Sequence, residues 1–296
     1  MQRPFTLPSF AKINWTLRIL GQREDGFHEV FTVFQTISLQ DTLLFEDGDL
    51  LELTCDDPAI PIDDRNLIIR AAEALRTQAG VEMGARLHLE KRIPSPGGLG
   101  GGSSNAAVAL MGLKKLWRID VSDDDLGAIA GELGSDVPFF LHGGTAIGTG
   151  RGEVIERIAA VDEQHMLVVT PDVRVSTRDA FARFGTSSLT SEAQERSLTV
   201  CRNEAKSQDL RHSVLINDFE ASVFDAYPEI RRVKQTLLDL GAVNAAMSGS
   251  GASVFGVFDK QETRQAALKA LDREINWRKF AVATISQDKY CEALTC

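Results

Sequence analysis

The sequence predicts an α+β protein of two domains, and three observations lead to that fold class. The chain has 296 residues, which is long for a single hydrophobic core. Strand patterns such as ARLHLEKRI (85–93) and helix patterns such as EIRRVKQTLLDLG (229–241) both occur along it. A new apolar strand, HMLVVTP (165–171), follows a glycine-rich stretch. We therefore expect an N-terminal domain (1–160) and a C-terminal domain (161–296).

Composition excludes several classes of protein. Apolar residues make up 43% and charged residues 25% of the chain, as in ordinary soluble proteins. No uncharged apolar run reaches membrane-spanning length, so we expect no transmembrane helix. The N-terminus lacks a signal-peptide pattern, and apparently structured sequence begins by Leu7, which favours a cytoplasmic protein.

Net charge and the spacing of cysteines and histidines indicate which ligands the chain is expected to bind. The net charge of −10 argues against nonspecific binding to nucleic acid, although an anionic small substrate responds to local charge. The cysteines form no C-x-x-C pair and the histidines no H-x-x-x-H pair, so we expect neither a disulfide framework nor a transition-metal centre. Free thiols in a reducing compartment are expected at Cys55, Cys201, Cys291 and Cys296.

The first elements follow from alternation and capping residues. FAKINWTLRIL (10–20) alternates apolar and polar residues as a strand does, and Lys12 falls on the polar face, so the pattern alone predicts an exposed lysine. A helix is predicted from an Asp64 N-cap to a Gly80 C-cap. ARLHLEKRI (85–93) again alternates and predicts a strand.

The next stretch, PSPGGLGGGSSNAA (94–107), joins this strand to an alanine- and leucine-rich helix. Ser103, Ser104 and Asn105 are candidate N-caps for that helix. A glycine-rich loop before a helix N-terminus is typical of an anion site, because free amides and the helix dipole face the ligand. A side chain at Gly100 or Gly101 should block phosphate while leaving the fold largely intact. The alternative is a flexible linker or tight turn.

Known phosphate motifs do not fit this loop. The P-loop pattern places lysine where this chain has Ser103, and the dinucleotide pattern requires a third glycine at the same position. Placement between a strand and a helix nevertheless favours a phosphate site over a linker.

The remaining elements follow from caps and periodicity. Ser122 and Asp125 form a capping box for a helix that ends at Gly134, and residues 143–153 are typical of glycine-rich hairpin turns. EIRRVKQTLLDLG (229–241) predicts an amphipathic helix with an apolar stripe of Ile230, Val233, Leu237 and Leu240. A glycine-containing loop then leads into a strand (247–258), and residues 185–210 indicate a surface helix or loop.

Three stretches together resemble a known superfamily. The glycine loop, SFAKINWTLRILGQREDGFHEV (9–30) and MSGSGASVF (247–255) are similar to the galactokinase, homoserine kinase, mevalonate kinase and phosphomevalonate kinase superfamily. With GSDVPFFL added, the combination most resembles the superfamily's kinases of 4-diphosphocytidyl-2-C-methyl-D-erythritol, in order from about Ser9 to Phe255.

The resemblance implies a two-domain small-molecule kinase fold with a cleft between the domains and the glycine loop at a helix N-terminus. It implies that ATP phosphorylates the C2 hydroxyl of the cytidine-containing diphosphate substrate, in non-mevalonate isoprenoid precursor biosynthesis. Mg²⁺ would accompany the nucleotide, held by phosphate oxygens and water, with no protein ligand assigned. No obligatory protein partner is expected. The ATP-binding residues implied are Pro94, Ser95, Pro96, Gly97, Gly98, Leu99, Gly100, Gly101, Gly102, Ser103 and Ser104.

Two residues match the family's catalytic positions. Lys12 would hold positive charge near the acceptor oxygen, and Asp136 would orient and deprotonate the hydroxyl. Without the resemblance, Lys12 is an exposed strand residue and Asp136, close before Pro138, is a helix cap or turn residue.

The resemblance also assigns a nucleoside pocket. Aromatic faces would stack on the cytosine and His28 would form a hydrogen bond with it, whereas pattern alone predicts core phenylalanines and a surface histidine. Tyrosine is common in the family where this chain has Phe27, a departure that keeps the stacking face and loses a hydroxyl. The substrate-binding residues implied are Asn14, Phe27, His28, Phe34 and Phe181.

Several alternatives stay open. The loop at residues 247–251 either approaches substrate phosphate or is a plain turn. Ser103 or Ser104 either contacts Mg²⁺ or a phosphate oxygen, or only caps the helix. Another alcohol kinase of the superfamily, of the homoserine or mevalonate type, would share the phosphate loop. A catalytically silent nucleotide-binding protein could use the same fold.

Overall fold

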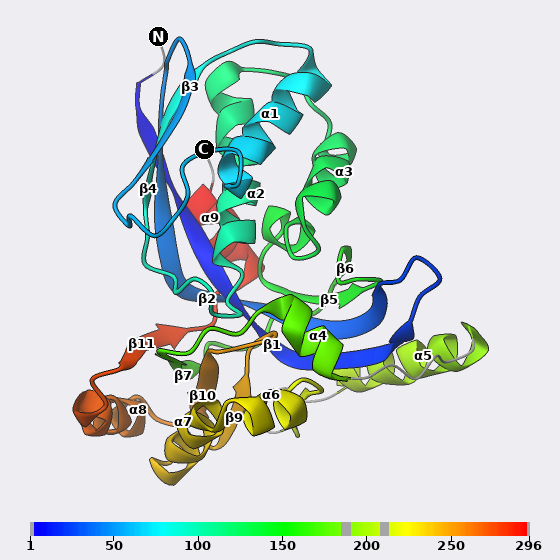
Figure 1. The fold of residues 1–296 in the computed structure, drawn as a ribbon, viewed down its shortest axis with the longest axis vertical. Helices are drawn as coiled ribbons and strands as arrows, with labels where there is room; N and C mark the ends of the chain where they lie inside the picture. The colour runs from blue at the N-terminus through cyan, green and yellow to red at the C-terminus, as the bar shows by residue number, and fades with distance from the viewer. Residues whose placement is uncertain (1–2, 185–190, 208–212, 295–296) are drawn as a thin grey trace.

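The computed structural model describes residues 3–184, 191–207 and 213–294, which form an upper and a lower part in Figure 1. A sheet with strand order β3-β4-β2-β1-β8 organises the upper part, and β5 and β6 extend it from β2. A second sheet, in the order β11-β7-β10-β9, organises the lower part. The first sheet comprises β1 (Phe5–Gln22), β2 (His28–Glu46), β3 (Leu51–Cys55), β4 (Ala85–Glu90), β5 (Thr145–Thr149), β6 (Val154–Arg157) and β8 (Ile216–Asn217). The second comprises β7 (His165–Pro171), β9 (Asn244–Met247), β10 (Val254–Phe258) and β11 (Trp277–Ala283).

Helices cover each sheet on its outer side. The upper group packs on the first sheet around a core that includes Leu75, Leu110 and Phe45; it comprises α1 (Leu67–Ala79), α2 (Gly101–Trp117), α3 (Asp123–Leu133) and the 3₁₀ turn η1 (Pro138–Leu141). The lower group comprises α6 (Glu220–Ala226), α7 (Pro228–Asp239), α8 (Gln261–Ala270) and the 3₁₀ turn η2 (Leu271–Arg273). The remaining helices are α4 (Thr177–Phe184), α5 (Ser191–Ser207) and α9 (Gln287–Leu294). In the described part of the chain, no helix has the length and apolar character that a bilayer crossing requires.

The long antiparallel pair β1 and β2 connects the two parts of the molecule. Its register shifts between Phe10 and Ala11 and again between Asn14 and Thr16. Side chains from its inner face pack against the second sheet, where the rings of Trp15 and Phe255 meet edge to face at 5.7 Å. This shared core fixes the first strand relative to both sheets.

Two predicted helix starts are wrong. Asn66, not Asp64, caps α1, because its side-chain oxygen accepts the Ile68 amide. Gly100 caps α2 in a left-handed conformation (φ +69°) without a side-chain hydrogen bond. The predicted caps Ser103, Ser104 and Asn105 therefore lie inside that helix.

The predicted strand over residues 85–93 is also too long. β4 ends at Glu90, because the amides of Arg92 and Ile93 donate to the Asp41 carboxylate instead of to a neighbouring strand. The cap predictions at Gly80, Gly134 and Ser122 are confirmed, since Ser122 accepts the Asp125 amide at the start of α3.

The other predicted elements are confirmed where the structure describes them. Residues 143–153 contain β5 and the turn that joins it to β6, and residues 165–171 form β7. Helix α7 buries Ile230, Val233 and Leu237, whereas Leu240, the fourth residue of the predicted stripe, is its C-cap and only half-buried. Within residues 185–210 the structure has α5, whereas 185–190 and 208–210 lie outside the described residues, as does Cys296.

The domain boundary near residue 160 stays a prediction. Residues 158–164 connect β6 of the first sheet to β7 of the second. The final helix, α9, then returns to the upper part (Figure 1), where the Tyr290 hydroxyl donates to the Phe140 carbonyl at 2.5 Å.

Candidate active site

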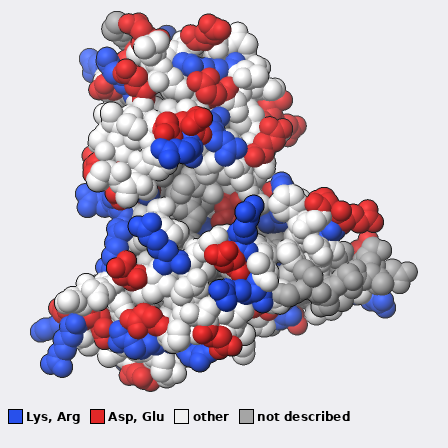
Figure 2. Space-filling model, viewed as in Figure 1, with Lys and Arg blue, Asp and Glu red and all other residues white. Residues whose placement is uncertain are grey.

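A cleft of about 370 Å³ lies between the two parts of the molecule. The surface in Figure 2 is hollowed there, with basic side chains on both sides of the hollow. Strands β1 and β2, the glycine loop, the segment before η1, helix α4 and the loop after β9 all contribute to its lining. In the described residues, no three acidic, histidine or cysteine side chains group as a metal site.

The glycine loop reaches the cleft at the first turn of α2. Residues 94–103 all line the cleft. The amide of Ser104 donates to the Gly100 carbonyl, so it closes the first helical bond. The amides of Gly101, Gly102 and Ser103 precede that bond and have no partner available within the helix. The position and the dipole of this open helix end suit it to binding an anion.

Ser104 lies on the other side of that first turn. Its side chain is fully buried and accepts a hydrogen bond from Ser9 Oγ at 2.8 Å, so its hydroxyl does not face the cleft. Of the two serines considered for Mg²⁺, Ser103 is the one that lines the cleft.

The glycines of this loop are required by the protein's own packing. A Cβ on Gly98 would lie 2.1 Å from the Ser248 carbonyl oxygen, and one on Gly100 would lie 2.8 Å from Phe140 Cζ. One on Gly101 would lie 3.0 Å from both Ile93 Cγ2 and Lys91 Nζ. Side chains at Gly100 and Gly101 would therefore disturb the fold as well as a phosphate, which corrects the expectation that the fold stays intact.

The glycine loop is joined to the loop at residues 247–251. Ser248 Oγ donates to the Gly98 carbonyl at 2.9 Å, and the Ser253 amide donates to the Gly97 carbonyl at 3.2 Å. Gly249, Ser250 and Gly251 also line the cleft. The second loop is therefore part of the site wall and more than a turn into β10.

Lys12 and Asp136, far apart in the sequence, meet in the cleft. Lys12 Nζ lies 3.3 Å from Asp136 Oδ2. The Asp136 side chain is 32% exposed, whereas Lys12 is only 3% exposed. The pairing is an ionic contact at the boundary between the buried wall and the open cleft.

The prediction from pattern that Lys12 is exposed is wrong. Its ammonium donates to Asn14 Oδ1 at 2.7 Å and to the Gly98 carbonyl at 3.0 Å, and it lies 5.6 Å from the centre of the Phe34 ring. The polar face of β1 is turned toward the glycine loop and not toward solvent, because the second sheet and this loop enclose the strand.

Asp136 has no capping role in η1. Residue Val137 occupies the N-cap position, and no side chain caps that turn. The carboxylate instead lines the cleft beside Ser135 and Lys12. This geometry favours the chemical interpretation of Asp136 over the cap.

The predicted nucleoside residues are brought into one region but not into one pocket. Asn14, Phe34 and Phe181 line the cleft. His28 stacks on Phe181 with ring centres 4.8 Å apart, and Phe27 projects outward at 53% exposure.

The Phe34 ring is buried and already has two neighbours. Phe139 stacks on its ring at 4.9 Å, and the Lys12 ammonium lies near it. The stacking of Phe34 on a base therefore stays a prediction, and its ring lies beside Lys12. His28 differs, because its Nε2 is buried and has no hydrogen-bond partner. Burial lowers the pKa of His28.

Sequence reasoning missed several residues in the cleft. Arg151 lines it, and its guanidinium lies 4.9 Å from the centre of the Phe27 ring. Thr177 of α4 and Ser250 share a hydrogen bond across it at 3.0 Å. A cation between glycines in GTGRGE was the only local signal, and it was interpreted as turn sequence.

Comparison with known proteins defines the class. The models of the GHMP kinases N terminal domain and the GHMP kinases C terminal domain match residues 66–144 and 199–276. The fold is also that of a homoserine kinase from Cytophaga hutchinsonii, with a TM-score of 0.73 at 21% identity over 98% of this chain and 97% of that one. The chain is thus a GHMP kinase, an ATP-dependent phosphotransferase.

Closer relatives define the family. The 4-diphosphocytidyl-2-C-methyl-D-erythritol kinase of Chlorobium limicola is 42% identical, covering 95% of this chain and 97% of that protein. The enzyme of the same name from Thermodesulfovibrio yellowstonii is 36% identical, covering 89% and 93%. A crystal structure of 4-(cytidine 5'-diphospho)-2C-methyl-D-erythritol kinase superimposes with a TM-score of 0.76 at 33% identity, covering 95% and 99%. The chain belongs to the 4-diphosphocytidyl-2-C-methyl-D-erythritol kinase family.

Proposed function

We propose that this chain transfers the γ-phosphoryl group of ATP to the C2 hydroxyl of 4-diphosphocytidyl-2-C-methyl-D-erythritol. The observation that carries the proposal is the contact of Lys12 with Asp136 beside the glycine loop, at 3.3 Å in an open cleft. Phosphoryl transfer needs a phosphate site, a positive charge and a group that accepts the hydroxyl proton, and these three parts meet here.

In this mechanism the loop at residues 94–103 holds the ATP phosphates through its amides. Asp136 orients the C2 hydroxyl and accepts its proton. The oxygen attacks the γ-phosphorus as the bond to ADP breaks, and Lys12 stabilises the negative charge that develops on the oxygens. Asn14 holds the Lys12 ammonium in place, because its Oδ1 accepts a hydrogen bond from Lys12 Nζ at 2.7 Å.

Mg²⁺ fits this site as a companion of the nucleotide. The Ser103 hydroxyl lines the cleft and could supply one oxygen ligand, while most of the ligands of Mg²⁺ would be phosphate oxygens and water. When bound, it would neutralise phosphate charge.

The nucleoside is assigned to the region of His28, Phe181 and Arg151. The stacked pair of His28 and Phe181 offers aromatic faces, and the unpartnered Nε2 can form a hydrogen bond with the base. Phe27 and Arg151 at the rim would close over the ligand. Loss of the His28 hydrogen bond should narrow the preference for cytidine over uridine.

The test is ADP release measured separately with 4-diphosphocytidyl-2-C-methyl-D-erythritol, homoserine and mevalonate. We expect turnover with the first substrate only. Turnover with homoserine or mevalonate instead would assign another kinase of the superfamily. ATP binding without turnover on any of the three would support a silent nucleotide-binding protein.

A further inference from the structure

A second ionic cluster lies beneath the glycine loop. Asp41 of β2 and Lys91, the residue after β4, form an ion pair in which Lys91 Nζ is 2.6 Å from Asp41 Oδ2. Asp41 is fully buried and Lys91 is 4% exposed. Within the described chain, neither residue belongs to the lining of the cleft, so neither is placed to touch ATP or the alcohol substrate.

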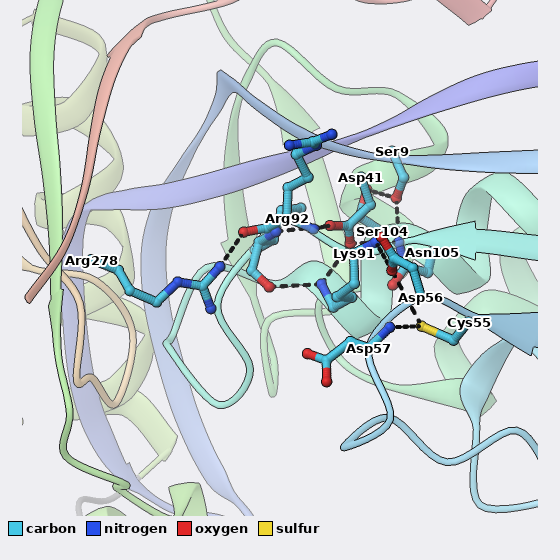
Figure 3. Close-up of polar contacts among 11 residues, drawn as sticks. Ser9, Asp41, Cys55, Asp56, Asp57, Lys91, Arg92, Ser104, Asn105 and Arg278 are labelled. Atoms are coloured by element: carbon cyan, nitrogen blue, oxygen red, sulfur yellow. Dashed lines mark hydrogen bonds and ion pairs between the residues drawn. The ribbon is translucent and has the colours of Figure 1, made fainter.

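The Asp41 carboxylate accepts four hydrogen bonds, which Figure 3 shows converging on it. Oδ1 accepts the amides of Arg92 and Ile93 at 2.7 and 2.8 Å. Oδ2 accepts Lys91 Nζ and, at 2.9 Å, Asn105 Nδ2. Residues 91–93 lead into the glycine loop and Asn105 follows it, so one carboxylate holds both ends of the loop.

The neighbouring contacts extend this hold to the start of α2. Asn105 Nδ2 also donates to Ser9 Oγ at 2.8 Å, and Ser9 Oγ donates to Ser104 Oγ. Lys91 Nζ donates to the Ile93 carbonyl at 2.8 Å. Because a Cβ on Gly101 would lie 3.0 Å from Lys91 Nζ, the ammonium lies against the first residue of the helix.

Stability alone is a poor reason to keep such a cluster. Two buried charges lose their hydration, and apolar residues of similar size often stabilise a core equally well. An ammonium close to a helix N-terminus is also unfavourable for the helix dipole unless an anion lies beside it. The ionic cluster instead fixes the orientation of the loop ends, because each of its hydrogen bonds holds one backbone or side-chain group there.

We propose that Asp41, Lys91 and Asn105 are positioning residues for the phosphate site. They fix the separation and direction of the two ends of residues 94–100, so that the amides at the start of α2 are aimed into the cleft before ATP binds. Donors arranged in advance bind phosphate without reorganisation. This proposal rests on the proposed phosphate site.

The test compares two variants of the network with a core control. Asp41→Asn removes the charge at nearly constant shape, and Asn105→Ala cuts the link to α2 but keeps the ion pair. Leu75→Ala in α1 is the control, because Leu75 is fully buried in the upper core and does not line the cleft. The measurements are kcat, the KM of each substrate and the rise in Tm that saturating ATP or saturating cytidine substrate produces.

We expect Asp41→Asn to raise the KM of ATP about tenfold or more and Asn105→Ala to raise it about threefold to tenfold, as for the loss of one or two polar contacts. The rise in Tm with ATP should shrink in both, while the cytidine substrate keeps its KM and its effect on Tm. Leu75→Ala should lower Tm and leave both KM values unchanged.

Wild-type KM values for ATP in folded Asp41→Asn and Asn105→Ala, with only a lowered Tm as in Leu75→Ala, would overturn the proposal. If Asp41→Asn does not fold, Asn105→Ala decides the question, since it retains the ion pair. If the wild-type protein itself shows no rise in Tm with ATP, the proposed function fails, and this proposal fails with it.

Discussion

On the proposed phosphate side of the cleft, the groups are fixed by hydrogen bonds and tight packing; this side comprises residues 94–103, Lys12 and Asp136. The Gly98 carbonyl alone accepts both Lys12 Nζ and Ser248 Oγ. On the proposed nucleoside side, the contacts are between the rings of His28 and Phe181 and between the Arg151 guanidinium and the Phe27 ring. There His28 Nε2 is buried without a partner and Phe27 is half exposed.

The difference indicates two ways of building one binding cleft. The phosphate side is arranged before its ligand arrives, which suits charge stabilisation during phosphoryl transfer. On the nucleoside side, His28 and Phe181 stack on each other, so a base must rearrange them to reach both faces. We therefore expect substitutions on the phosphate side to reduce turnover or ATP binding, and those on the nucleoside side to change the KM of the second substrate.

The largest effect is expected for Asp136→Asn. The variant keeps the shape of the side chain but removes the proton acceptor, so kcat should fall by about 10²–10⁴-fold with little change in substrate binding. Steady-state kinetics and substrate titration measure the two quantities separately. A kcat within a few-fold of wild type would make Asp136 a structural residue, and the phosphate side would lose its catalytic group.

Lys12→Met should follow closely. It retains the length of the side chain against Phe34 but removes the ammonium that contacts Asp136 and Gly98. Loss of one stabilising charge should lower kcat by about 10²–10³-fold. Thermal unfolding is the control, because a variant that loses Tm but keeps its kcat would show that Lys12 serves only packing.

The site could be predicted from the sequence only in part. The strand–glycine loop–helix order was predictable from local pattern, and so was the amphipathic helix α7. The burial of Lys12 was not, since it depends on the loop and the second sheet that enclose β1. The role of Asp41 was equally invisible: its partners come from residues 91–93 and 105, which only the fold brings together.

Gly102→Val should sharpen the distinction between packing and phosphate approach. A Cβ there would meet only Leu67 Cδ1, at 3.8 Å, and Gly102 is exposed in the cleft. The valine side chain should prevent hydrogen bonds between the loop amides and the charged phosphate. Their loss should reduce the binding free energy of ATP by about 1.5–3 kcal/mol, which raises the KM of ATP about 10–150-fold. The control is Gly127→Val on α3, where a Cβ has no atom within 4 Å. Normal ATP binding in a folded Gly102→Val protein would contradict the phosphate site.

Phe181→Ala tests the nucleoside side. Stacking of a base on an aromatic ring contributes about 1–3 kcal/mol, so the KM of the cytidine substrate should rise about 5- to 150-fold. The KM of ATP should stay near the wild-type value. Phe27→Ala is the informative companion: it should raise the same KM by less, because Phe27 must leave its exposed position near Arg151 to reach the base. If neither variant changes that KM, the base binds elsewhere.

The smallest effect expected is a pH dependence that comes from His28. Burial lowers the pKa of His28 from its ordinary value near 6.5, because the Nε2 atom is enclosed and has no partner that would stabilise a proton. The unfolded chain therefore takes up a proton at His28 near pH 6.5, while the folded protein leaves this side chain neutral until the pH is lower. The free energy of unfolding should thus be highest above about pH 6.5 and should decrease as the pH falls from there toward the folded pKa.

Urea unfolding of wild type and His28→Asn between about pH 7.5 and 5.5 measures this contribution. The loss of stability on acidification should be smaller in the variant, since asparagine does not titrate. His142→Asn is the matched comparison: burial and Arg157 lower the pKa of His142 as well, but this residue is in contact with Arg157 and not with Phe181. Bound cytidine substrate should change the His28 contribution and leave that of His142 unchanged, because only the Nε2 of His28 would gain a partner. An identical pH dependence of stability for wild type and His28→Asn would show that His28 is exposed to solvent. The nucleoside side would then have no enclosed histidine that lacks a hydrogen-bond partner.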